Sequence, residues 1–147
     1  MGRVVELELP ARPAYLALAR LVVAAAATTE PLLGDDRLDD LRLAVSEACT
    51  NAIEAQAAAD HDDDHIVVRC LVEDDHIQVL VQDRGRGFDL EALASHPPVT
   101  DPARLEFERG LGIPLIRILT DEVEFASSTE GTAVTMTLYA PFADGTR

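Results

Sequence analysis

The chain has 147 residues, enough for one compact domain that buries its own hydrophobic core. Its formal net charge of -15 at pH 7 argues against a broad phosphate-binding surface, and its longest apolar run, residues 21–27, falls far short of the roughly 20 residues that a membrane span needs. We therefore expect a single domain over residues 1–147 that is cytoplasmic and binds neither nucleic acid directly nor a membrane.

The core is expected to be aliphatic. Aromatic residues make up only 4% of the chain and tryptophan is absent, so alanine, valine, leucine and isoleucine must fill the interior. Cys49 and Cys70 lie in apolar segments and are too few for a metal knuckle or a disulfide framework. They are predicted to be reduced core thiols.

The first predicted elements are a strand and two helices. Val4–Leu9 alternates as a strand does, and a proline follows it directly. Residues 14–27 are rich in helix formers. After a loop, Asp35 or Asp36 is placed to cap a second helix that runs to about residue 59.

The second predicted helix carries a polar strip beside its apolar stripe. Glu47 and Asn51 are four residues apart and so lie one above the other, with Glu54 on the same side. Such a strip at the edge of a core is typical of a binding site and equally of an ordinary solvated helix face. The apolar stripe recurs at three- and four-residue steps: Leu41, Val45, Ala48, Ala52 and Ala55.

The sequence of the middle of the chain predicts a β-hairpin followed by a lid. Residues 66–72 and 77–81 are strand-like and flank a short acidic turn. The segment at about residues 88–109 has three prolines and many charges, and a weakly patterned stretch of this length in a small domain is often a functional lid.

The last predicted elements are a short helix and two strands. Leu115–Leu119 (LIRIL) is apolar except for Arg117 and follows a proline, which suits a helix start. Residues 122–126 and 133–139 alternate as two closing strands. The predicted order is therefore strand, two helices, two strands, lid, helix and two strands.

Two glycine pairs flank the lid. Gly85 and Gly87 follow Asp83 at the end of a strand, and Gly110 and Gly112 precede the third helix. The spacing fits neither a dinucleotide fingerprint nor a Walker A loop. Glycines still permit close approach of a ligand, and a helix start favours phosphate, although ordinary turns explain either pair alone.

Taken in chain order, four segments resemble the N, G1, G2 and GT boxes of the GHKL ATPase superfamily: Ser46–Asn51 (SEACTN), Asp83–Phe88 (DRGRGF), Arg109–Ile113 (RGLGI) and Gly131–Val134 (GTAV). Within this superfamily, the sequence of Leu43–Ile53 (LAVSEACTNAI) is similar to that of the bacterial anti-sigma factor serine kinases. The resemblance implies an α+β, Bergerat-type ATP-binding fold. That fold is a two-layer sandwich, in which a mixed, mostly antiparallel sheet of about five strands is covered on one face by three helices.

The resemblance also implies roles for the residues of the first two boxes. Glu47 would be the catalytic residue that orients or deprotonates the attacking hydroxyl, and Asn51 would hold Mg²⁺ against the phosphates of ATP. Asp83 would accept a hydrogen bond from the adenine amino group, while Gly85 and Gly87 leave room for the base and ribose.

The later boxes would bind the rest of the nucleotide. Gly110, Leu111 and Gly112 would wrap the triphosphate, and Thr132 would assist Asp83 at adenine. Arg109 would either touch the terminal phosphate or lie exposed on the lid. One departure concerns residues 52–56 (AIEAQ), where family members commonly carry a His-Gly or His-Ala pair soon after the asparagine.

The function implied by the resemblance is that of an anti-sigma factor with ATP-dependent protein serine kinase activity, acting in transcription regulation under stress. Such a protein sequesters a sigma factor, phosphorylates an anti-anti-sigma protein and forms a homodimer. Two alternatives stay open. One is a non-catalytic ATP-binding or nucleotide-free regulatory binding module of the same fold. The other is a detached histidine-kinase catalytic domain, which is disfavoured because all histidines fall in predicted turns or loops.

Overall fold

The computed structural model describes residues 2–58, 65–84, 113–128 and 131–141. Every predicted strand and helix is present in these ranges. In chain order the elements are β1 (Arg3–Pro10), the 3-10 helix η1 (Pro13–Tyr15), α1 (Leu16–Ala27), α2 (Asp35–Ala58), β2 (His65–Val72), β3 (His76–Gln82), α5 (Ile113–Leu119), β4 (Glu122–Ser128) and β5 (Gly131–Tyr139).

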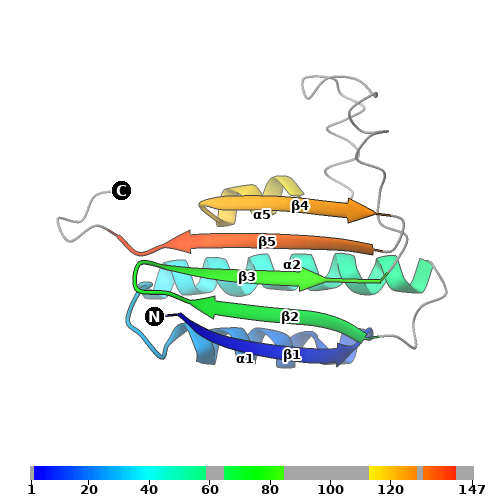
Figure 1. Ribbon diagram of the computed structural model, residues 1–147, viewed down its shortest axis with the longest axis horizontal. Helices are drawn as coiled ribbons and strands as arrows, with labels where there is room; N and C mark the ends of the chain where they lie inside the picture. Colours follow the sequence, from blue (N-terminus) through cyan, green and yellow to red (C-terminus); the bar gives the residue numbers. More distant parts are fainter. Residues whose placement is uncertain (1, 59–64, 85–112, 129–130, 142–147) are drawn as a thin grey trace, which may run out of the picture.

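The strands form one sheet in the order β1-β2-β3-β5-β4. Figure 1 shows α1, α2 and α5 stacked behind one face of this sheet, with α2 lying along its centre. The predicted α+β two-layer sandwich is thereby confirmed. All four strand pairings are antiparallel, so the described sheet lacks the parallel pair that a mixed sheet would contain.

Alternation along the strands divides the sheet into a core face and an open face. In the central strands every second residue points toward the helices and is buried, as a period of two requires. Register aligns these residues across the sheet, so that Val79 lies between Cys70 and Met136. The buried face is almost wholly aliphatic, as composition predicted: Ile66, Val68, Cys70, Val72, Ile77, Val79, Val81, Val134, Met136 and Leu138.

Both cysteines belong to this core and neither is disulfide-bonded. Burial raises the pKa of the Cys49 thiol to about 12 and that of the Cys70 thiol to about 11, because the thiolate is poorly solvated there. The prediction of reduced core thiols is confirmed.

The start of α2 differs from the prediction. Leu38 donates its backbone N–H to the carbonyl of Gly34 at 2.9 Å, which makes Gly34 the cap residue. Asp35 and Asp36 therefore lie in the first turn of the helix and do not cap it. Their carboxylates still interact favourably with the positive end of the helix dipole. In the part of the chain that the structure describes, no helix is long and apolar enough to cross a membrane.

Candidate functional site

Asp83 stands where β3 ends, and β5 holds it through two hydrogen bonds. The Asp83 N–H donates to the Thr132 carbonyl at 2.9 Å, and the Thr132 N–H donates to Asp83 Oδ1 at 3.2 Å. The two residues are only 6% and 8% exposed. The structure thus brings together the two residues that were predicted at the adenine end, and the second bond orients the Asp83 carboxylate toward the Thr132 main chain.

Gly131 makes this close approach of β5 to Asp83 feasible. Its φ of +149° is a conformation that L side chains rarely adopt, and a Cβ placed there would lie 2.1 Å from the Asp83 carbonyl oxygen. Any other residue at position 131 would push the main chain of Asp83 away. Glycine is needed here for space as well as for its backbone conformation.

A cavity of about 470 Å³ opens beside Asp83, between the ends of β3 and β4 and the start of β5. Its polar lining includes Asp83, Ser127 and Thr132, and the hydroxyls of Ser127 and Thr132 share a hydrogen bond of 3.1 Å. Small-molecule sites commonly occupy roughly 300–1,000 Å³. The cavity therefore suits a ligand the size of a nucleotide base with its sugar.

Glu47 and Asn51 lie half-buried on α2. Steps of three and four residues place them on one strip with Arg37, Asp40 and Ala44. Arg37, in the first turn of α2, contacts α5, as described next. The site prediction for Glu47 and Asn51 thus falls on the boundary between core and solvent, where the sequence placed it.

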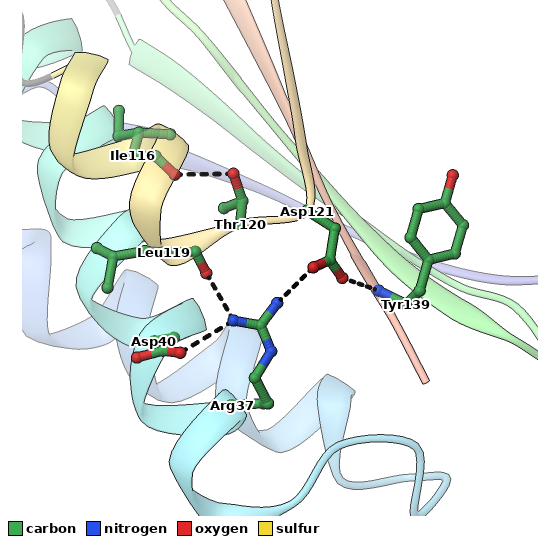
Figure 2. A network of polar contacts seen from close by, with 7 residues as sticks. All are labelled: Arg37, Asp40, Ile116, Leu119, Thr120, Asp121 and Tyr139. Carbon is green, nitrogen blue, oxygen red and sulfur yellow. Dashed lines mark hydrogen bonds and ion pairs between the residues drawn. The ribbon is translucent and has the colours of Figure 1, made fainter. Parts of the chain in front are cut away.

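Arg37 fastens the end of α5 to the beginning of α2, as Figure 2 shows. Its Nη1 donates to Asp40 Oδ2 at 3.0 Å and to the Leu119 carbonyl at 3.2 Å, and its Nη2 donates to Asp121 Oδ1 at 3.1 Å. Asp121 in turn accepts the backbone N–H of Tyr139 at 2.7 Å through Oδ2. One guanidinium therefore ties together α2, α5 and the turn that leads into β4.

These contacts hold the C-terminal end of α5 against the first turn of α2. The helix runs back along α2 from its C-terminal end at Arg37 (Figure 1). Its seven residues span about 10 Å, the same length of α2 that separates Arg37 from Ala44. Over this length the two helices pack against each other.

Six of the predicted site residues lie outside the described residues: Gly85, Gly87, Arg109, Gly110, Leu111 and Gly112. The predicted lid at about 88–109 lies outside them as well. The four that are described form two pairs, Asp83 with Thr132 at the sheet edge and Glu47 with Asn51 on α2.

Gln56 is a residue of this site that sequence reasoning missed. It is fully buried on α2, and its Oε1 accepts the backbone N–H of Arg84 at 3.0 Å. Sequence reasoning assigned Ala55 to the apolar stripe, whereas Gln56 is the residue buried in it and Ala55 is half-buried. The sequence signal for this burial was the position of Gln56 four residues after Ala52, which places both on the same side of the helix.

Comparison with known proteins agrees with this geometry. Residues 9–138 match the family model described as "Histidine kinase-like ATPase domain". The serine-protein kinase RsbW of Bacillus pumilus is 35% identical over 140 residues, covering 92% of this chain and 85% of the relative. The RsbW proteins of Bacillus velezensis and Listeria monocytogenes are 37% and 36% identical over 139 and 138 residues, again covering 92% of this chain, and 84% and 86% of those relatives.

Two solved structures share the fold at 19% sequence identity. One contains the RsbU and RsbW domains of a Mycobacterium tuberculosis protein, with a TM-score of 0.68 over 94% of this chain and 32% of that one. The other is the histidine kinase domain of a blue-light activated kinase from Erythrobacter litoralis, with a TM-score of 0.52 over 88% of this chain and 65% of that one. With the family model matching residues 9–138 and the RsbW relatives aligning over most of both chains, this chain belongs to the histidine kinase-like ATPase family and, within it, to the RsbW serine-protein kinases.

Proposed function

We propose that this protein is an anti-sigma factor and an ATP-dependent serine kinase, which sequesters a sigma factor and phosphorylates a serine of an anti-anti-sigma protein. The observation that carries the proposal is the Asp83–Thr132 pair, a buried carboxylate held at the rim of a cavity in a chain of the RsbW family. A carboxylate in this position can accept a hydrogen bond from an exocyclic amino group, which adenine offers.

The phosphates of ATP would then point toward α2 and the start of α5. Asn51 presents an amide at the half-buried edge of α2, and an amide oxygen is a hard ligand of the kind that Mg²⁺ prefers. The described residues hold no cluster of three or more acidic, histidine or cysteine side chains fit for a metal. Mg²⁺ is usually held by one or two protein oxygens together with phosphates and water, and it would neutralise phosphate charge when bound.

Glu47 is proposed to act on the attacking serine. Its carboxylate is half-exposed and one helical turn from Asn51, so a protein substrate can reach it beside the phosphates. Glu47 would orient the serine hydroxyl and accept its proton as the hydroxyl oxygen bonds to the terminal phosphorus and the bond to ADP breaks. Positioning and charge neutralisation supply most of the rate in such transfers.

A kinase assay tests these roles. Purified protein with Mg²⁺-ATP and its cognate antagonist should yield phosphoserine, detected by mass spectrometry. Glu47→Ala should abolish transfer and leave ATP affinity, measured by calorimetry, nearly unchanged. Glu54→Ala is the matched control, since Glu54 is an exposed glutamate on the same helix. Transfer that survives in Glu47→Ala at the wild-type rate would refute the role given to Glu47.

Measurements of ATP binding and phosphate transfer on the wild-type protein also distinguish the kinase from the alternative of a non-catalytic binding module. ATP binding without any transfer to the antagonist would identify a non-catalytic binding module of the same fold. Calorimetry that detects no ATP binding at millimolar nucleotide would exclude both the kinase and an ATP-gated module.

Partner capture and dimerisation belong to the same proposal. The net charge of -15 would attract a sigma factor with a basic DNA-contacting face, so affinity should fall as salt rises from low to physiological concentration. A dissociation constant that does not respond to salt would count against electrostatic capture. Light scattering on the purified protein tests the homodimer, and a monomer mass at micromolar concentration would contradict it.

A further inference from the structure

Gln56 is an unusual residue in the buried stripe of α2. Its side chain is 0% exposed, and all other buried residues of this helix are apolar: Leu41, Ala44, Val45, Ala48, Cys49, Ala52 and Ile53. Burying an amide costs free energy unless it is hydrogen-bonded, whereas a leucine or methionine of similar size would fill the same space without that cost. The amide is therefore best explained by what it binds.

The amide oxygen of Gln56 accepts the backbone N–H of Arg84 at 3.0 Å. Arg84 directly follows Asp83, whose own backbone and carboxylate are bonded to Thr132 on the opposite side. The short segment that carries the carboxylate is thus held from β5 on one side and from α2 on the other. Among the described residues that line the cavity are Asp83 and Arg84, so Gln56 reaches the cavity wall through this segment.

We propose that Gln56 is a positioning residue for base recognition, which sets the Asp83 carboxylate so that the site selects adenine over guanine nucleotides. This inference rests on the proposed ATP-binding function. Adenine carries an amino donor at the ring position where guanine carries a carbonyl oxygen, so a fixed carboxylate attracts the first and repels the second. A carboxylate that is free to shift discriminates less between the two bases, because guanine is rejected only if the carboxylate is held facing the guanine carbonyl oxygen, so that two hydrogen-bond acceptors meet.

Gln56 also links the two ends of the site. It lies five residues after Asn51 on the same helix, so the residue proposed to act at the phosphates and the residue that fixes the base end share one rigid element. The helix therefore fixes the spacing between Asn51 and Gln56.

The substitution Gln56→Met tests the inference, because methionine keeps the length of the side chain and removes the acceptor. ATP and GTP affinities of the full chain are measured by calorimetry. We expect ATP affinity to fall roughly tenfold, which corresponds to about 1.4 kcal/mol, with GTP affinity nearly unchanged. The transfer rate at saturating ATP should stay within about twofold of wild type, because Gln56 contacts neither the attacking group nor the phosphates in this scheme.

Gln78→Met is the matched control. Gln78 makes a hydrogen bond too, in which its Nε2 donates to Thr137 Oγ1 at 3.3 Å, but it lies on the open face of the sheet and remote from Asp83 in the strand register. This variant should keep the wild-type ratio of ATP to GTP affinity. If Gln56→Met weakens both nucleotides equally or lowers only the melting temperature, the residue is merely structural and the inference is overturned.

A second measurement keeps the inference testable if Gln56→Met does not fold. Hydrogen exchange by NMR on the nucleotide-free wild-type protein should show the Arg84 amide to be protected, and exchange at the rate of an unstructured peptide would overturn the inference. Failure of the proposed function gives a different result, since a wild-type protein that binds neither ATP nor GTP refutes ATP binding itself. A wild type that prefers ATP, with Gln56→Met equally selective, refutes only the role of Gln56.

Discussion

Replacing Arg37 with methionine removes the guanidinium that fastens α5 while keeping most of the aliphatic stem. Two of the three lost contacts are ion pairs, to Asp40 and Asp121, whose side chains and that of Arg37 are about one-third exposed at 34–37%. Pairs at this exposure contribute about 0.2–1 kcal/mol each. The third contact places a cation on the Leu119 carbonyl at the C-terminal end of α5, which contributes about 0.3–1 kcal/mol.

We therefore expect Arg37→Met to lower the free energy of unfolding by about 1–2 kcal/mol and the melting temperature by about 3–6 °C. Urea and thermal denaturation followed by circular dichroism at low ionic strength measure both quantities. The difference from wild type should shrink in 1 M salt, because the ion pairs are partly exposed and are screened.

Arg42→Met is the matched control on the same helix. Arg42 pairs with Asp39 at 2.9 Å, but that pair joins residues within one turn and its side chains are 45% and 69% exposed. Its loss should cost less than about 0.5 kcal/mol. Equal destabilisation by the two substitutions would refute the reasoning, since it would mean that the long-range contacts of Arg37 contribute nothing beyond a local surface pair.

Two further predictions concern the site and the core. Gly131→Ala should destabilise the fold by about 2–4 kcal/mol and weaken ATP binding measured by calorimetry, because its Cβ would overlap the main chain of Asp83. The control is Gly34→Ala, where a Cβ meets open space and the cost should be less than about 1 kcal/mol. Similar losses of stability in both variants would contradict the role of close approach. The free energy of unfolding should fall as the pH rises from about 9 toward 11, by up to about 1.4 kcal/mol per pH unit for each thiol, because burial raises the pKa of Cys49 and Cys70 above the ordinary value of 9.0 that they have when unfolded. The chain has no lysine, whose ordinary pKa lies in this range. Urea denaturation across this range checks the slope, and an equally steep slope after replacement of both cysteines by alanine would contradict the assignment.

The secondary structure could be predicted from the sequence because its signals are local. In β3, for example, every second residue from Ile77 to Val81 is apolar and buried, so alternation alone identified the strand and its core face. The start of α2 was predicted one or two residues late, since aspartate is a better cap than glycine by preference and only the Leu38–Gly34 hydrogen bond reveals the cap.

Contacts between distant segments could not be predicted in the same way. Arg37 and Asp121 are 84 residues apart, and each looks like an ordinary surface charge in its own segment. Gln56 was missed for a related reason, because a polar residue in a helix is expected to face solvent and its partner, the Arg84 N–H, is a backbone group without a sequence signature. Asp83 and Thr132 could be expected beside each other only because a family resemblance supplied the long-range information that local pattern lacks, and the structure places them in contact.

The length of α2 sets a constraint on how this protein tolerates change. The helix carries the α5 anchor in its first turn, the proposed chemistry in its middle and the support for the base in its last turns, spread over 24 residues and about 36 Å. A loop absorbs an inserted residue, but one residue inserted into α2 between Asn51 and Gln56 would rotate everything beyond it by about 100°. Gln56 would then turn away from Arg84 while Glu47 and Asn51 kept their places, so this helix should accept substitutions on its exposed side and reject any change of length.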